Sequence, residues 1–153
     1  MTFSNLLNPD LVLIRTDCTS KDDLIAILTE KIHKADIGIP VSQSDLLASI
    51  FTREKIGGTL LPSGLSVPHS RLGNYEDIII ALATPKEPLF HEELQIRLMA
   101  LMISSQTGGL YYLPTIAALT KISRDSEYFS RLCAAGDKEE FLSILMEKDP
   151  ELK

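Results

Sequence analysis

The stretch TREKIGGTLLPSGLSVPHSR, residues 52–71, organises our interpretation of the whole chain. It joins the end of a predicted helix to a loop punctuated by glycine and proline, and a short apolar strand then leads to His69. Gly57 and Gly58 are typical helix terminators, so the helix should end near Lys55. A loop at the end of a strand is where a rigid sheet can hold a reactive side chain. We therefore expect this stretch to hold one histidine, His69, with an accessible and uncharged ring.

Two amphipathic helices are predicted before this stretch. Ser20 is a typical N-cap, and apolar residues recur at helical spacing through residues 21–35. His33 falls opposite that apolar stripe and should face solvent. Ser42, with Asp45 three residues later, predicts the start of the second helix. Its expected buried face consists of Leu46, Leu47, Ile50 and Phe51.

Four apolar runs have the length of strands. They are Asp10–Arg15, Leu65–Val67, Asp77–Thr84 and Ile96–Ser104. A helix is the competing interpretation of the last run, because Leu, Met and Ala are helix formers. Its brevity and its place after a proline-rich segment favour a strand.

The C-terminal third should be helical. A turn at Gly108 and Gly109 precedes a helix over 113–123, and a second helix is predicted over 125–135. Asp137 and Glu140 have the spacing of a capping box for a last helix. With strands grouped centrally and helices available for both faces, the chain should form one α/β domain.

Composition excludes several classes of protein. A chain of 153 residues can bury a proper core, and its 44% hydrophobic and 24% charged residues are ordinary for a globular protein. The net charge of −6 and the scattered Lys and Arg argue against a nucleic-acid binder. We expect no membrane insertion, since no apolar run approaches about 20 residues. The start, MTFSNLLNPDLVL, lacks the features of a signal peptide, which favours a cytoplasmic location without a disulfide between Cys18 and Cys133.

His69 is the best candidate for chemistry. His91 has no metal-ligand spacing to the other histidines, so we expect no metal site. The small residues of Gly57–Thr59 would allow backbone N–H groups to approach an anion, although a plain structural turn is the more common role. Arg53 could grip a phosphate on His69, or it could be a surface arginine paired with Glu54; spacing alone leaves both open.

These residues resemble a known family. TREK, then GGT, then SGLSVPHSR is similar to the signature of phosphotransferase-system enzyme IIA domains of the fructose/mannitol type, and the nitrogen-regulatory members are most similar. The likeness extends from about Asn5 to about Leu145. The segments with a counterpart in the same order are NLLNPDLVL, LATPKEPLF, IRLMALMIS, YLPTIAALTKIS and AAGDKEEFLSIL.

The resemblance implies a fold and a function. The fold would be a single domain over residues 1–153, a three-layer sandwich with a mixed β-sheet flanked by helices on both faces. His69 would accept a phosphoryl group from a histidine phosphocarrier protein, without a cofactor. Arg53 would stabilise the phosphoryl charge and Thr59 would lie in the phosphate-contacting turn. Tyr112 stands where the family usually has a second active-site histidine, and its hydroxyl could still donate to phosphate.

Three positions depart from the family pattern and keep alternatives open. Leu60 and Pro62 stand where glycine is common, and Ser63 stands where asparagine is common. The leading hypothesis is a regulatory phosphohistidine carrier acting on target proteins. One alternative is a sugar-uptake enzyme IIA that passes phosphate to a cysteine of a IIB domain. The other is a degenerate protein-binding module without phosphotransfer.

Overall fold

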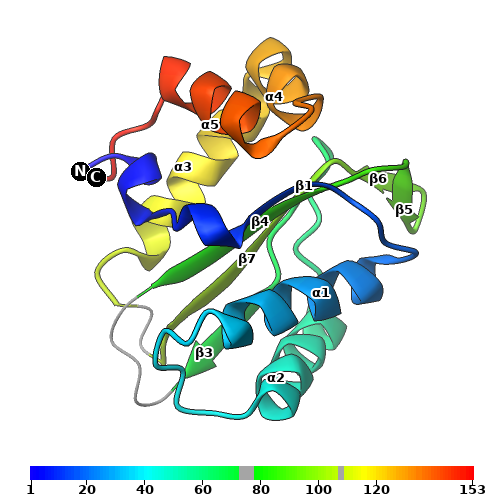
Figure 1. Cartoon of the computed structure of the whole chain (residues 1–153), viewed down its shortest axis with the longest axis vertical. Helices are drawn as coiled ribbons and strands as arrows, with labels where there is room; N and C mark the ends of the chain where they lie inside the picture. The colour runs from blue at the N-terminus through cyan, green and yellow to red at the C-terminus, as the bar shows by residue number, and fades with distance from the viewer. Residues whose placement is uncertain (73–77, 107–108) are drawn as a thin grey trace.

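A mixed β-sheet lies at the centre of the fold, with helices against both of its faces (Figure 1). The protein's structure, a computed structural model, describes residues 1–72, 78–106 and 109–153. The strands of the central sheet are β1 (Val12–Thr16), β2 (Leu65–Ser66), β3 (His69–Leu72), β4 (Ile79–Pro85) and β7 (Leu98–Ser105). This confirms the predicted α/β sandwich.

The sheet is mixed because β7 has both parallel and antiparallel neighbours. β4 runs antiparallel to β7, whereas β2 and β3 run parallel to it, and β1 runs parallel to β4. β2 and β3 lie end to end along one edge of β7, with Leu65 opposite Leu98 and His69 opposite Met102. The break between them falls at Pro68, whose missing N–H is tolerated at an edge strand.

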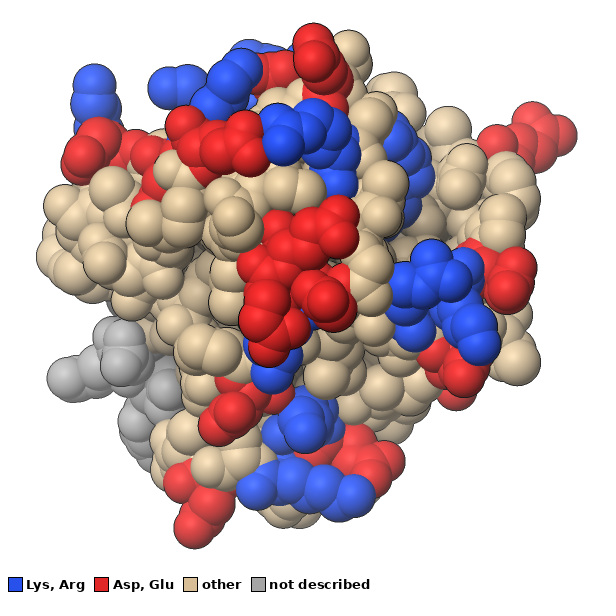
Figure 2. Space-filling model, turned by 45° about the horizontal axis from the view of Figure 1, so that its top comes forward, with Lys and Arg blue, Asp and Glu red and all other residues tan. Residues whose placement is uncertain are grey.

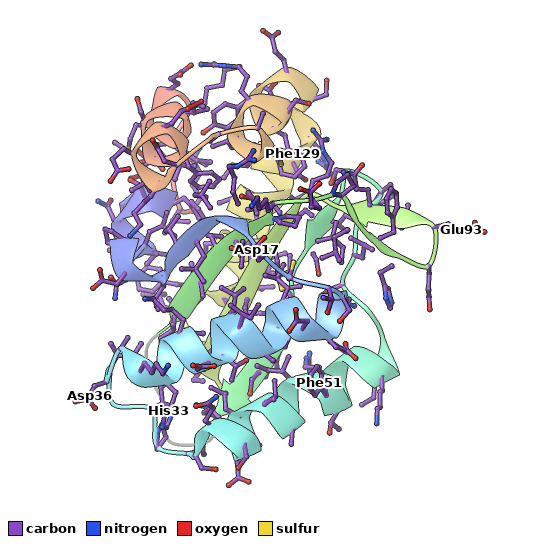
Figure 3. All side chains as sticks on the ribbon, turned by 45° about the vertical axis from the view of Figure 1, so that its right-hand side comes forward. Asp17, His33, Asp36, Phe51, Glu93 and Phe129 are labelled. Carbon is purple, nitrogen blue, oxygen red and sulfur yellow. The ribbon has the colours of Figure 1, made fainter. Side chains whose placement is uncertain are left out.

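One helical layer consists of α1 (Lys21–Lys34) and α2 (Gln43–Ile56). The hydroxyls of Ser20 and Ser42 accept hydrogen bonds from the backbone N–H three residues later, so both predicted N-caps are confirmed. His33 is exposed near the C-terminal end of α1, as its position on the helix predicted (Figure 3).

The other layer consists of α3 (Tyr112–Arg124), α4 (Ser126–Cys133) and α5 (Lys138–Glu147). Figure 3 shows Phe129 of this layer and Phe51 of α2 on opposite sides of the sheet. A hydrophobic core lies on each face of the sheet. Alternate residues of β7 belong to the two cores, because successive side chains along a strand point to opposite faces. Leu98, Ala100 and Met102 pack towards α3; Met99, Leu101 and Ile103 pack towards α1 and α2.

The predicted strand Ile96–Ser104 is divided in two. Its first residue ends β6 (Leu94–Ile96), which forms a separate hairpin with β5 (Leu89–His91). The chain changes partner at Arg97, because the backbone N–H groups of Arg97 and Leu98 both donate to the carbonyl of Gly64. The hairpin therefore projects from the end of the sheet rather than extending it.

Smaller differences concern element ends. The predicted strand at Asp10–Arg15 starts later, because Pro9–Leu11 forms a 3-10 turn, η2. Glu140 does not complete the predicted capping box: its carboxylate accepts from the N–H of Gly136 instead of that of Asp137. Asp77 and Gly108, which belonged to a predicted strand and a predicted turn, lie outside the described residues.

The two ends of the chain lie side by side (Figure 1). The 3-10 turn η1 (Phe3–Leu6) is attached to the C-terminal segment by a hydrogen bond of 2.8 Å from Phe3 N to Pro150 O, and Leu152 N donates to Met1 O at 2.9 Å. These contacts fix both ends beside α3 and α5.

The surface carries charges of both signs. Figure 2 shows Lys and Arg interspersed with Asp and Glu over one face. Such mixing does not provide the basic stripe that binding a phosphate backbone requires. Within the described ranges, none of the helices has both the length and the apolar character needed to cross a bilayer.

Candidate functional site

His69 is the first residue of the edge strand β3, and not part of a loop as the sequence suggested. Ser70 and Leu72 point towards α2: the hydroxyls of Ser70 and Ser49 are 2.6 Å apart, and Leu72 belongs to the core beneath α1 and α2. Because side chains alternate along a strand, His69 and Arg71 point to the opposite face, towards α3.

The imidazole of His69 is enclosed. Its side chain is 3% exposed, because the ring of Tyr112 stacks on it with centroids 4.7 Å apart and planes at 16°. Nε2 lies 2.9 Å from the hydroxyl oxygen of Ser104, and Nδ1 is buried without a hydrogen-bond partner in the described part of the chain. The sequence predicted an accessible ring; the structure instead covers it with Tyr112.

The pKa of His69 is lowered from 6.5 to about 4, mainly by burial and also by the positive charges of Arg53 and Arg71. All three causes disfavour the imidazolium. The ring is therefore neutral near pH 7. A neutral imidazole keeps a lone pair and is a competent nucleophile.

A cavity of about 530 Å³ adjoins the ring. Arg53, Thr59, His69 and Tyr112, the four residues selected from the sequence, all line it. They come from the end of α2, the following turn, β3 and the start of α3, which meet at the β2–β3 edge of the sheet. The remaining wall is largely apolar and is formed by Ile56, Leu61, Val67, Leu113, Ile116 and Leu119.

Arg53 is exposed and makes no salt bridge to any described residue. The alternative that it pairs with its neighbour Glu54 is wrong, because Glu54 pairs with Lys21 at 2.6 Å. The guanidinium is thus available to an anion that enters the cavity, and a planar guanidinium suits phosphate oxygens.

Thr59 is held by its neighbours. Its hydroxyl donates to Glu54 Oε2 at 3.3 Å, and its carbonyl accepts from Val67 N at 3.2 Å. The hydroxyl is therefore directed at a carboxylate, and contact with a phosphate would require it to rotate. The turn that follows closes through Gly64 at φ +98°, a conformation that favours glycine.

Two residues of the site were missed in the sequence. Ser104 is the next-to-last residue of β7, and only the register of β3 against β7 brings it to His69. Arg71 lies over the ring of Tyr112, with its Cζ 5.0 Å from the ring centroid. The signal for Arg71 was available, since a residue two places after His69 shares its face if both lie on a strand.

The other candidate residues lie apart from this cavity. His91 ends β5, where its Nε2 is 3.9 Å from Glu92 Oε1. Cys18 and Cys133 are both free thiols. Over residues 1–72, 78–106 and 109–153, no group of three or more His, Cys, Asp or Glu side chains could hold a metal ion.

The class of protein to which the chain belongs follows from a match to a known family. Residues 5–148 match the family described as "Phosphoenolpyruvate-dependent sugar phosphotransferase system, EIIA 2", and the chain belongs to this family. The predicted membership of the fructose/mannitol type is thereby confirmed.

Two relatives indicate the range of this family. The chain is 29% identical over 153 residues to the 2-O-alpha-mannosyl-D-glycerate-specific EIIABC component of Escherichia coli K12, covering 97% of this chain but only 23% of that protein. It is 27% identical over 155 residues to a nitrogen regulatory protein of Klebsiella oxytoca, covering 96% of this chain and 91% of the relative.

Solved structures share the fold. The nitrogen regulatory protein IIA-Ntr of Neisseria meningitidis superposes with a TM-score of 0.75 at 19% identity, covering 93% of this chain and 97% of that one. The mannitol IIA of Escherichia coli superposes with a TM-score of 0.74 at 19% identity, covering 91% of this chain and 98% of that one. A chain in a complex of mannitol IIA with phosphorylated mannitol IIB, also from Escherichia coli, superposes with a TM-score of 0.73 at 18% identity. The match covers 92% of this chain and 97% of that one.

Proposed function

We propose that this protein is a cytoplasmic phosphoryl carrier that accepts a phosphoryl group on His69 from a histidine phosphocarrier protein. One observation carries the proposal: a neutral, enclosed imidazole lines the same cavity as a guanidinium that makes no salt bridge within the described part of the chain. The imidazole supplies the nucleophile and the guanidinium supplies charge stabilisation, and phosphoryl transfer requires little else from a protein.

The transfer step balances without a metal or an added reactant. A lone pair of the neutral His69 ring attacks the phosphorus of the donor's phosphohistidine. A P–N bond forms on His69 while the donor's P–N bond breaks, and its electron pair returns to the donor nitrogen. Each imidazole keeps its own N–H proton. Arg53 binds the equatorial phosphoryl oxygens, where charge is concentrated in the transition state.

The rim of the cavity suits a protein donor. Ile56 is 85% exposed and Leu113 is 72% exposed, and both line the cavity that contains His69. Exposed apolar side chains around a site mark a surface that another protein covers. A docked donor would exclude water from the reacting groups and strengthen the attraction between Arg53 and the phosphoryl group.

For the role after phosphorylation we propose regulation. Support comes from the nitrogen regulatory protein of Klebsiella oxytoca, to which the chain is 27% identical over 155 residues. Transfer onward to a IIB cysteine is the alternative, and the mannitol IIA–IIB complex shows that such a pairing exists for a protein of this fold. The two roles differ in whether purified IIB domains remove the phosphoryl group.

A protein-docking function without phosphotransfer is the competing proposal, and one observation favours it. Tyr112 covers the ring of His69, and Nε2 is already bonded to Ser104, so neither ring nitrogen meets the cavity freely in this conformation. In that case the apolar rim would still bind a partner, but His69 would never carry phosphate.

Incubation with phosphoenolpyruvate, enzyme I and the phosphocarrier protein separates these proposals. Intact mass should rise by one phosphoryl group in the wild type and in His33→Ala, which replaces an exposed side chain that does not line the cavity. His69→Ala should show no rise. A wild type that stays unmodified while a control enzyme IIA is phosphorylated would leave docking as the function.

A further inference from the structure

A buried ion pair joins the two helices behind the site. Lys21 Nζ lies 2.6 Å from Glu54 Oε1, with side chains only 6% and 9% exposed. Lys21 is the first residue of α1, and Glu54 lies in the last turn of α2. Burying two charges costs free energy, and a well-packed apolar pair of similar volume is often at least as stable. A contribution to stability therefore does not explain why two charged residues occupy these buried positions.

Both charges also oppose their own helices. The N-terminus of a helix carries partial positive charge and the C-terminus partial negative charge. Lys21 places a cation at the N-terminus of α1, and Glu54 places an anion at the C-terminus of α2. Neither is favoured by its own helix, so each depends on the other for compensation.

Glu54 is also the immediate neighbour of Arg53. Its buried Oε1 lies 2.6 Å from the ammonium of Lys21, which balances its charge. Its Oε2 accepts from the hydroxyl of Thr59, in the turn that lines the cavity. Without Lys21, the cations adjacent to Glu54 in the sequence are Arg53 and Lys55. Pairing of Glu54 with Arg53 would take away the guanidinium that the site requires, and only Arg53 of the two lines the cavity.

We propose that Lys21 is a positioning residue: it holds Glu54 in the buried pair and so leaves Arg53 free to bind the phosphoryl group on His69. The inference rests on the proposed phosphoryl transfer. It predicts that losing Lys21 harms the site through Arg53, and that removing the charge of Glu54 as well repairs it.

The test compares single and double variants in phosphorylation rate. Lys21→Met leaves Glu54 uncompensated, so Arg53 should pair with it and phosphorylation should slow at least about tenfold. Lys21→Met/Glu54→Gln removes the competing carboxylate and should return the rate to within about twofold of wild type. The matched control is Lys34→Met, which breaks an exposed pair with Glu30 on the same helix and should leave the rate unchanged.

A second readout needs no phosphate. The pKa of His69, followed by NMR titration of its ring protons, should rise in Lys21→Met because Arg53 moves away, and should fall again in the double variant. Lys21→Gln, which keeps a hydrogen-bond donor but no charge, should behave like Lys21→Met and replaces it if that variant does not fold.

The outcomes are distinct. A double variant as slow as the single one, with the pKa of His69 unchanged in both, would overturn the inference and leave the pair a structural contact. A wild type that accepts no phosphate would overturn the proposed function instead, and the NMR titration alone would then decide whether Lys21 controls Arg53.

Discussion

The ring of Tyr112 lies flat on the ring of His69, with centroids 4.7 Å apart. From the family resemblance we expected a second polar group of the site at this position. The structure shows that the side chain also covers the ring of His69, the proposed nucleophile. In-line attack on phosphorus needs an open path to a ring nitrogen. To free a ring nitrogen for phosphorylation, Tyr112 would have to move away or the hydrogen bond between His69 Nε2 and the hydroxyl of Ser104 would have to break.

The first prediction concerns this stacking. Tyr112→Ala should raise the pKa of His69 from about 4 towards 6.5, because the ring gains water and burial is the largest cause of the lowered value. Tyr112→Phe keeps the aromatic ring and should leave the pKa low. NMR titration of the imidazole protons measures both, and an alanine variant with an unaltered titration would show that Tyr112 does not cause the desolvation.

The second prediction concerns Arg53. Arg53→Ala should slow phosphorylation of His69 by about 100-fold, the usual cost of removing one group that stabilises transition-state charge. Thermal stability should change little, since the side chain is exposed and unpaired in the described structure. Arg124→Ala, at the exposed end of α3, is the matched control and should phosphorylate normally. Equal rates in both variants would remove Arg53 from the site.

The third prediction is a pH dependence of stability. His69 titrates at about 4 in the folded protein and near 6.5 when unfolded, so between these values the unfolded chain binds the extra proton. Stability from this group is complete above pH 6.5 and is lost as the pH falls towards 4. At about 1.4 kcal/mol per pH unit, the loss approaches about 3 kcal/mol.

Chemical denaturation at a series of pH values measures this slope. His69→Gln should flatten it between pH 6.5 and 4, while His33→Gln, which changes an exposed histidine, should leave it unchanged. Equal slopes in the two variants would mean that other groups cause the dependence.

The fourth prediction concerns the turn before β2. Gly64 has φ +98°, and a Cβ there would lie 2.8 Å from the side chain of Arg97 and 2.9 Å from Gln95 O. Gly64→Ala should therefore destabilise the protein by about 2 kcal/mol or more. Gly57→Ala is the control, because a Cβ at that position meets nothing within 4 Å. Thermal melting of both variants gives the comparison.

The helices were the most predictable part of the fold. Ser20 and Ser42 are strong local signals because a capping hydroxyl bonds only three residues away. The division of the strand at Arg97 could not be predicted, because it depends on a carbonyl of Gly64 that is distant in sequence. Helix caps can be predicted because they depend on residues close in sequence, whereas strand ends depend on hydrogen-bond partners that are distant in sequence.

The site divides in the same way. The resemblance located Arg53 and Thr59, and the structure brings both to one cavity with His69. Ser104 was missed because its contact with His69 arises from strand register. The enclosure of His69 was missed too, since spacing does not say which way a tyrosine at the start of the next helix will turn.

The most direct test of the central claim is to map the phosphoryl group after incubation with phosphoenolpyruvate, enzyme I and the phosphocarrier protein. Mass spectrometry of proteolytic fragments at neutral pH should place a single, acid-labile phosphoryl group on the fragment containing His69. A phosphoryl group on another residue, or none under conditions that load a control enzyme IIA, would contradict it.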